Sequence, residues 1–287
     1  MNINDLHAFV SVSEHGSFSL AAEALHLTQP AVSKRIAALE QTLGTQLFDR
    51  VGRTITPTEA GRALLHHAQR ILGEVEDSRR AIANLEHSVK GQLKLATSHH
   101  IGLHRLPRVL KQFIQQYPEV QLDLSFMDSE QACRAVEQGA QELSLITLPP
   151  QTSTQLELIE VWTDRLVLTV SPSHPLAREA TINAEVLARH PAILPARGTY
   201  TRELIDQQLG LPDINTQLET HYLETIKMMV EVGMGWSLWP DNMIDDELKP
   251  EQGSDIAVER KLGIVRHPQR TLSNAARAFI DICRSAA

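Results

Sequence analysis

Residues 17–44 carry the pattern that most constrains how this 287-residue chain can fold. After Ser17, apolar residues recur at the three- and four-residue spacing of one buried helix face: Phe18, Ala21, Ala22 and Leu25. Thr28 is a good N-cap for a second helix, and Pro30 falls in its first turn, where a missing N–H costs little. Gly44 supplies a C-terminal stop. The segment therefore predicts two short helices across a tight turn.

The second of these helices has two unlike faces. Its buried stripe is predicted to comprise Val32, Ile36, Leu39 and Leu43. Its opposite face carries Pro30, Lys34, Ala37, Ala38 and Gln41, flanked by Gln29 and Ser33. The small alanines let a partner approach the backbone closely. Gln29 can pair bidentately with adenine, Ser33 can reach a base or a phosphate, and Lys34 and Arg35 add positive charge. This face suits the DNA major groove.

Basic residues recur just after this pair of helices. Arg50 and Arg53 lie three residues apart beyond a Leu-Phe pair, and the segment 56–61 follows. These arginines predict a basic wing beside the helix that faces the groove. An ordinary amphipathic helical hairpin is the alternative, and spacing alone leaves it open. The short polar face and the paired arginines argue against that alternative.

The order of these residues resembles the N-terminal domain of LysR-type transcriptional regulators. The resemblance rests on Gly16-Ser-Phe, Ala21-Ala, Leu27-Thr-Gln-Pro-Ala-Val-Ser33, Leu39-Glu, Leu43-Gly, Leu47-Phe, Arg50, Arg53, Thr58 and Ala60-Gly61. It implies a winged helix-turn-helix whose second helix meets the major groove and whose wing arginines contact phosphates or the minor groove. The candidate DNA-binding residues are Thr28, Gln29, Pro30, Ser33, Lys34, Arg35, Arg50 and Arg53.

Length and charge agree with a regulator of several domains. A chain of 287 residues should form two or three domains, and its net charge is −8. Residues 1–58 hold four basic residues against five acidic ones, which predicts few phosphate contacts per subunit and a need for dimerisation. The sequence shows no apolar run of membrane-spanning length and no signal peptide at its N-terminus, so we expect a cytoplasmic protein.

A heptad pattern follows the predicted DNA-binding domain. The apolar seam comprises Leu64, Ala68, Ile71, Val75, Ser78, Ile82, Leu85 and Val89. It predicts a helix of about 45 Å at the usual rise per residue. Such a narrow stripe favours a dimer seam, while packing on the chain's own core is the alternative. The family resemblance implies that two such helices pair antiparallel and that two dimers form a tetramer.

Beyond Gly91 the pattern changes to alternating strands and helices. Strands are predicted at 93–97, 120–126, 143–148, 166–170, 192–195, 216–220, 233–240 and 262–265, and helices at 103–113, before Gly139, after Tyr200, at 224–231 and at 273–283. Such repeated units predict a mostly parallel sheet with helices on both faces. Two segments, 174–176 and 232–240, resemble the effector domain of the LysR-type family.

The resemblance implies an α+α/β chain: a winged helix-turn-helix, a linker helix and a two-lobe α/β effector domain similar to periplasmic binding proteins. The predicted domains are 1–58 for DNA binding, 59–90 for the linker and 91–287 for the effector. Chain crossings near 161–163 and His267 would divide the last into lobe I, residues 92–161 and 268–287, and lobe II, residues 162–267.

Two stretches at predicted strand ends suit a small anion. Residues 98–102 precede a lobe I helix and residues 195–202 precede a lobe II helix, so each places hydroxyls and free N–H groups at a positive helix terminus. The candidate effector-binding residues are Ser98, His99, His100, Thr147, Arg197, Thr199, Tyr200 and His221. The predicted effector is a small carboxylate or inorganic oxyanion. The alternative is that Ser98 and Thr199 serve only as N-caps and that Arg197 is a solvated loop residue.

Other constellations are weak. The 13 histidines form no standard zinc motif, and His99 and His100 lack a cysteine or a nearby carboxylate in the sequence, so we predict no metal site and no cofactor. Some members of the family sense peroxide through two cysteines, but Cys133 and Cys283 are expected to be buried packing residues. Ser144 stands where the family usually has aspartate, which puts in doubt any role expected from a carboxylate there.

Three function classes compete. An enzyme on this fold needs a triad or metal cluster in the cleft, and the sequence offers neither. A solute-binding protein predicts a signal peptide and no N-terminal DNA-binding domain, and both predictions fail. The sequence therefore predicts a transcriptional regulator, not an enzyme, that binds double-stranded promoter DNA and a second copy of itself. RNA polymerase is a further expected partner if the protein activates transcription.

Overall fold

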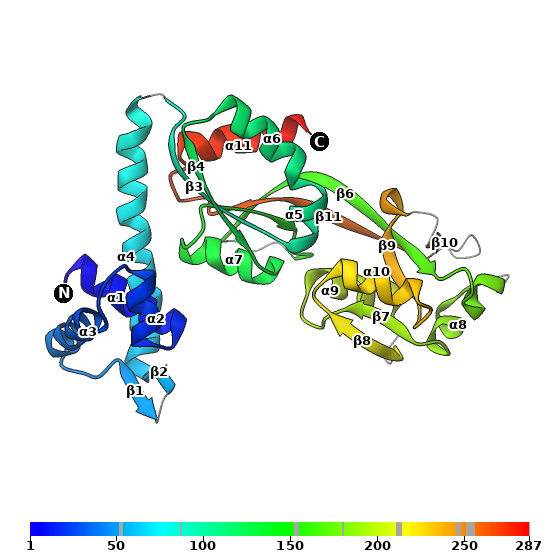
Figure 1. The fold of residues 1–287 in the computed structure, drawn as a ribbon, viewed down its shortest axis with the longest axis horizontal. Coiled ribbons are helices and arrows are strands. Elements are labelled where there is room, and N and C mark those ends of the chain that lie inside the picture. The colour runs from blue at the N-terminus through cyan, green and yellow to red at the C-terminus, as the bar shows by residue number, and fades with distance from the viewer. Residues whose placement is uncertain are drawn as a thin grey trace. The chain divides into compact units, whose positions relative to one another are not determined.

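A computed structural model describes residues 1–51, 54–86, 88–151, 155–179, 181–210, 214–244, 248–250 and 256–286 (Figure 1). The chain divides into two compact units. One comprises residues 1–86 with 138–140, and the other comprises residues 87–137 with 141–287. None of the helices in the described ranges is both long enough and apolar enough to span a bilayer.

The first unit is a helical domain with a β-hairpin. Its elements are α1 (Ile3–His15), α2 (Phe18–Ala24), α3 (Gln29–Leu43), β1 (Phe48–Val51), β2 (Thr54–Pro57), α4 (Glu59–Ala83) and the 3₁₀ turn η1 (Asn84–Glu86). The side chains of Ser17 and Thr28 accept hydrogen bonds from the first turns of α2 and α3. Gly44 has φ +67 and ends α3 in the left-handed region. The predicted pair of short helices and its turn are confirmed.

The core of this unit is a single apolar cluster beneath α3. Val32, Ile36 and Leu39 of α3 are almost fully buried in it. Leu43, predicted to continue the stripe, is 41% exposed, because the cluster ends one turn earlier. Leu47 and Phe48 bring the chain back into the core instead.

Helix α4 is shorter than the predicted seam. It ends at Ala83, so Leu85 lies in η1 and Val89 lies beyond the helix, packed on the core of the second unit. Leu64 and Ala68 pack on the core of their own unit, as the alternative reading of the seam expected. Farther along, Ile71 is 39% exposed and Ile82 is 70% exposed. The alternative reading is therefore confirmed for the start of the seam, while pairing of its exposed part with a second subunit stays a prediction.

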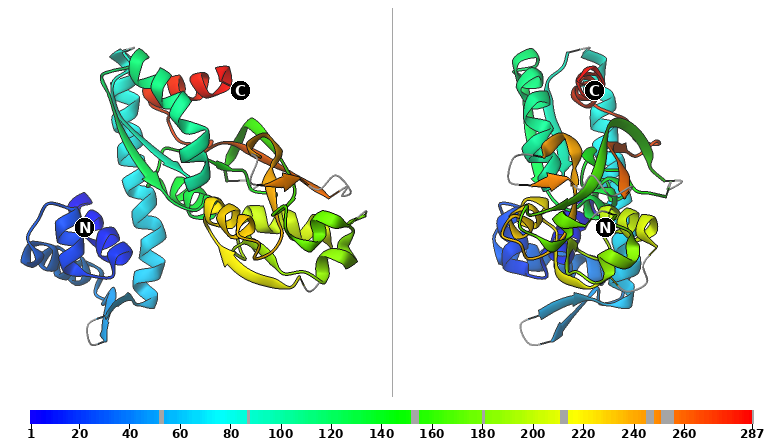
Figure 2. Two further views of the ribbon diagram at one scale, coloured as in Figure 1. Left: turned by 45° about the vertical axis from the view of Figure 1, so that its right-hand side comes forward. Right: turned by 90° about the vertical axis from the view of Figure 1, so that its right-hand side faces the viewer.

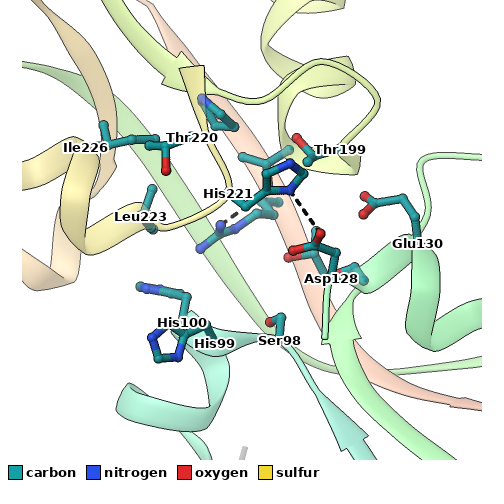
Figure 3. Close-up of a pocket in the computed structure, with 15 residues that line it drawn as sticks. Ser98, His99, His100, Asp128, Glu130, Thr199, Thr220, His221, Leu223 and Ile226 are labelled. Carbon is teal, nitrogen blue, oxygen red and sulfur yellow. Dashed lines mark hydrogen bonds and ion pairs between the residues drawn. The ribbon is translucent and has the colours of Figure 1, made fainter. Parts of the chain in front are cut away.

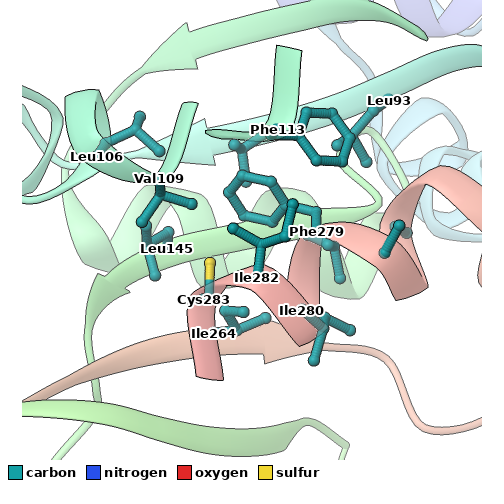
Figure 4. Close-up of a cluster of buried hydrophobic side chains, with 14 of the residues drawn as sticks. Leu93, Leu106, Val109, Phe113, Leu145, Ile264, Phe279, Ile280, Ile282 and Cys283 are labelled. Atoms are coloured by element: carbon teal, nitrogen blue, oxygen red, sulfur yellow. The ribbon is translucent and has the colours of Figure 1, made fainter. Parts of the chain in front are cut away.

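Lobe I of the second unit has helices on both faces of its sheet. Its elements are β3 (Gly91–Thr97), α5 (His99–His104), α6 (Leu106–Gln116), β4 (Val120–Phe126), α7 (Ser129–Gln138), β5 (Leu143–Thr147) and α11 (Asn274–Ser285). Strands β4, β3 and β5 are parallel in that order. Figure 2 shows α6 beside α11, and Phe113 meets Phe279 between them at a ring-centroid distance of 5.4 Å (Figure 4). On the other face of the sheet, Ala96 and Ile146 belong to a second apolar cluster, which also includes residues of α7.

One predicted lobe I helix is two helices. The pattern at 103–113 predicts a single helix, but α5 ends at His104, and α6 begins at Leu106 after Arg105. Pro107 explains the break, because its nitrogen cannot donate to the carbonyl four residues earlier. Leu103 is therefore 49% exposed rather than part of the core.

Lobe II has its own sheet and its own two apolar clusters. Its elements are η2 (Pro175–Arg178), α8 (Ala184–Ala188), β7 (Ala192–Pro195), α9 (Tyr200–Leu209), β8 (Thr216–Thr220), α10 (Leu223–Glu231), β9 (Ser237–Pro240), η3 (Asp241–Met243) and β10 (Lys249–Pro250). Strands β7 and β8 are parallel. Trp236 is fully buried, and its Nε1 donates to the carbonyl oxygens of Leu187 and His190.

Two long strands connect the lobes. Strand β6 (Glu157–Val170) leads from lobe I to lobe II, and β11 (Ala257–Arg266) leads back, so the two are antiparallel. The expected mostly parallel sheet is therefore wrong for these strands and for β9 and β10, which pair antiparallel with β6. The register between β6 and β11 shifts between Leu262 and Gly263, and the predicted crossing near His267 stays a prediction. From Leu262 onward, β11 pairs with β5 of lobe I.

Candidate functional site

Helix α3 presents a polar first turn on its exposed side. Gln29, Pro30 and Lys34 are exposed, while Ser33 and Arg35 are partly buried. Gln29 Nε2 donates to Ser33 Oγ at 3.2 Å, so these two side chains form one small polar patch. Thr28 Oγ1 accepts from the Ala31 N–H at 3.4 Å and acts as the cap.

The predicted wing is a two-stranded hairpin. Strands β1 and β2 are antiparallel and pair Asp49 with Thr56 and Arg50 with Ile55. The Arg50 side chain and the whole of Arg53 lie outside the described residues, so their DNA-contacting role stays a prediction. Ile55 packs against the apolar cluster beneath α3, which anchors the hairpin to the helices.

A pocket lies between the two lobes of the second unit, at the ends of β3, β5, β7 and β8. It has a volume of about 550 Å³, part of it open to solvent. Six of the eight predicted effector-binding residues line it: Ser98, His99, His100, Thr147, Thr199 and His221 (Figure 3). Lobe I contributes the first four and lobe II the last two.

The other two predicted residues lie elsewhere. Arg197 does not line the pocket: its side chain is 70% exposed and pairs with Glu219 at 3.3 Å. Tyr200 presents only its backbone near the pocket, where its N–H donates to Glu130 Oε1 at 2.5 Å. Its side chain packs against the apolar cluster that includes α7. The sequence placed both residues in the correct loop but gave no information on which way each side chain points.

The pocket contains charged residues that the sequence did not reveal. Asp128 and Glu130 come from the start of α7, and Arg260 comes from β11. His221 Nδ1 lies 3.0 Å from Asp128 Oδ2 across the pocket (Figure 3). Ser129, Pro195, Thr201, Thr220, Leu223 and Ile226 complete the lining. No spacing motif joins these residues, because they meet only after both lobes have folded.

Arg260 belongs to a buried charge cluster. Its Nη2 lies 2.6 Å from Asp164 Oδ2, and Arg105 Nη2 lies 2.6 Å from Asp164 Oδ1. The Asp164 side chain is fully buried and the Arg260 side chain is 3% exposed. Burial alone would raise the pKa of Asp164, but the two guanidinium groups outweigh it and hold this pKa below its ordinary value. Arg260 Nε is buried and has no hydrogen-bond partner within the described ranges.

Two histidines and a glutamate meet beside the pocket. Glu224 Oε1, in the first turn of α10, lies 3.1 Å from His100 Nδ1 and 3.0 Å from His104 Nε2, both of α5. Burial would raise the pKa of Glu224, but hydrogen bonds from these groups lower it to about 2. Burial lowers the pKa of His100. The sequence places no carboxylate close to His99 and His100, but the fold brings one to His100, since Glu224 lies 124 positions away in the chain.

Comparison with known proteins identifies the architecture. Residues 86–287 match the family model for the LysR substrate binding domain, and residues 3–62 match the model for the bacterial regulatory helix-turn-helix protein, lysR family. The chain belongs to the LysR family of transcriptional regulators. It is thus a DNA-binding regulator with an effector domain, and not an enzyme.

Relatives and solved structures extend over the whole chain. The HTH-type regulator YeiE of Escherichia coli is 34% identical, and the match covers 99% of this chain and 97% of YeiE. Full-length OxyR from Pseudomonas aeruginosa has a TM-score of 0.75 at 22% identity and covers 100% of this chain and 96% of its own. CbnR, solved in complex with its target DNA, has a TM-score of 0.64 at 21% identity, with full coverage of both chains. These two structures show the shared fold.

The cysteines of this LysR-type regulator are both buried and free. Burial raises the pKa of Cys133 to about 11 and that of Cys283 to about 12, so both are thiols at neutral pH. Cys133 packs on the α7 side of the lobe I sheet and Cys283 on the α11 side. Ser144, in place of the usual family aspartate, is fully buried in β5, and its hydroxyl makes no hydrogen bond with any described residue.

Proposed function

We propose that this LysR-type regulator binds a small ligand carrying one anionic group in the pocket between its lobes. The proposal rests on one observation: the pocket contains hydrogen-bond donors that make no hydrogen bond within the described part of the protein. Arg260 Nε is buried without a partner, and the hydroxyls of Ser98 and Thr147 make no hydrogen bond within the described ranges. A carboxylate or oxyanion accepts from N–H and O–H donors of this kind.

The acidic side of the pocket restricts the ligand further. Asp128 and Glu130 line the same space and would repel a second negative charge. Asp128 is paired with His221, and Glu130 accepts from the Tyr200 N–H. The pocket therefore favours a monoanion over a dianion, and a ligand that also carries a hydroxyl or ammonium donor matches the two carboxylates.

Calorimetric titration of the full-length protein with a panel of small anions tests this proposal. Monocarboxylates, hydroxy- and amino-carboxylates and inorganic oxyanions are compared with neutral aromatic compounds of similar size. The Ser98→Ala variant should bind the best anion about 10- to 150-fold more weakly, because a hydrogen bond to a charged group contributes about 1.5–3 kcal/mol. Arg197→Ala is the matched control: Arg197 neighbours the pocket but pairs outward with Glu219, so affinity should not change. Tight binding to neutral aromatics alone would contradict the proposal.

We also propose that the regulator binds promoter DNA as a dimer through α4 and reads base sequence with the first turn of α3. The exposed isoleucines of α4 support pairing, because an apolar stripe on a helix of this length needs a partner surface. The exposed Gln29–Ser33 patch supports base contacts. A dimer of dimers, and contact with RNA polymerase by an activator, follow from the family resemblance and stay predictions.

A further inference from the structure

His100, His104 and Glu224 form a compact group of metal-ligating side chains from both lobes. His100 and His104 are four residues apart on α5 of lobe I and so project from the same helix face. Glu224 reaches them from the first turn of α10 in lobe II. One ligating atom from each residue lies within 4.8 Å of the other two.

The hydrogen bonds within this group leave polar atoms unsatisfied. Glu224 uses only Oε1 for both histidines, and its Oε2 is buried with no donor in the described part of the chain. A buried carboxylate oxygen without a donor is costly in free energy. A cation held by this carboxylate would interact with both of its oxygens and remove that cost.

We propose that His100, His104 and Glu224 bind one divalent transition-metal ion of the zinc, cobalt or nickel class. Two imidazoles and one carboxylate are the donor set that these ions favour, whereas calcium and magnesium need mostly oxygen ligands. Metal bonds of about 2.0–2.2 Å place tetrahedral ligand atoms roughly 3.3–3.5 Å apart. The two distances to Glu224 Oε1, 3.1 and 3.0 Å, thus need to increase by only a few tenths of an ångström.

The ion would join α5 of lobe I to α10 of lobe II. Its affinity therefore depends on how the lobes are closed, and a pocket ligand that changes closure changes metal affinity by the same factor in return. His100 also lines the pocket, so the metal site and the ligand pocket share one side chain. The inference does not depend on the proposed ligand class, because metal alone is used to test it.

The experiment measures metal binding by the metal-free, full-length protein. Equilibrium dialysis against Zn²⁺ gives the stoichiometry and affinity, and titration with Co²⁺ gives a visible absorption band whose intensity reports four-coordinate geometry. We expect one high-affinity site per chain. In Glu224→Gln and His104→Ala its affinity should fall at least about 100-fold, since losing a residue that merely orients a ligand already costs about 10- to 100-fold.

A matched control separates this site from the chain's other histidines. His66→Ala removes an exposed histidine of α4 in the other unit and should leave the stoichiometry and affinity unchanged. The His104 and Glu224 side chains are 36% and 32% exposed, so their variants should retain the native tryptophan fluorescence. Absence of binding in the wild-type protein would overturn the inference, and so would unchanged binding in folded His104→Ala. The latter would leave the group as a hydrogen-bonded contact between the lobes.

Discussion

Replacing Asp164 with asparagine should strongly destabilise the effector domain. The Asp164 carboxylate is fully buried and lies 2.6 Å from each of two guanidinium groups, those of Arg105 and Arg260. Asparagine preserves the shape but leaves the buried Arg260 charge uncompensated. Removing one partner from a buried ion pair costs about 3–5 kcal/mol. For a domain of this size each kcal/mol lowers Tm by about 2–4 °C, so the expected decrease in Tm is roughly 6–20 °C.

Tryptophan fluorescence is a suitable assay because the three tryptophans of the chain, Trp162, Trp236 and Trp239, all lie in the effector domain. Thermal and urea unfolding of the full-length protein followed by this signal therefore report on that domain alone. Glu160→Gln is the matched control. Glu160 is on the same strand and pairs with Lys261 of β11 at 2.8 Å, but both side chains are largely exposed. Its loss should change Tm by no more than the measurement error.

The pH dependence provides a second criterion. The pKa of Asp164 is lower in the folded state, so its stabilising contribution is present above the pKa of an unfolded aspartate, about 3.9, and is lost as the pH falls through the folded pKa. The stability difference between wild type and Asp164→Asn should be constant at neutral pH and shrink below about pH 4. If Asp164→Asn destabilises the domain no more than Glu160→Gln, the reasoning from buried charge is wrong.

Two further predictions concern DNA binding and assembly. In gel-shift titrations, Gln29→Ala should weaken binding to promoter DNA by about 1–3 kcal/mol and should hardly affect binding to unrelated sequences. Arg53→Ala should weaken binding to all sequences alike. An equal loss of affinity for every sequence in Gln29→Ala would refute base recognition by Gln29. Ile82→Glu should shift the protein towards monomers in sedimentation velocity, because Ile82 is 70% exposed on the seam of α4. Ala81→Glu, on a neighbouring exposed face, is its control, and an unchanged oligomer in Ile82→Glu would contradict pairing through this part of the helix.

The sequence predicted the elements of this fold better than it predicted their connections. Helical periodicity and caps identified α2 and α3, because the interactions that define a short capped helix are local. Pairing across the lobes was not predicted. Each of the two crossing strands contains a short apolar run that was predicted as a strand, but the strand continues into polar residues such as Asp164–Arg165. The alternation of apolar and polar residues does not show that the strand extends that far. Antiparallel pairing of β6 and β11 follows from the chain leaving and re-entering lobe I.

The pocket residues that are adjacent in sequence were predicted, whereas those that are far apart in the chain were missed. Ser98, His99 and His100 directly follow a strand, so their place at the sheet edge could be inferred. Asp128 follows β4 at the same edge but was not singled out. Arg260 and Glu224 carry no such signal: each is a charged residue in an amphipathic segment that would ordinarily face solvent. Their burial depends on the contact between lobes, which no local pattern encodes.

The way in which the lobes meet explains how a small ligand can control this protein. Each lobe has its own apolar core, and several described contacts across the pocket are polar: His221 with Asp128, the Tyr200 N–H with Glu130, and Glu224 with two histidines. Ring contacts such as that of His99 with Tyr222, and the packing of the Tyr200 side chain on lobe I, accompany them. A polar contact of this kind contributes only about 0.5–1.5 kcal/mol net, or somewhat more where a charge is involved. The free energy of lobe closure is therefore comparable with the difference in affinity that a few ligand contacts provide. A ligand that competes for these polar groups can shift closure without disturbing either core.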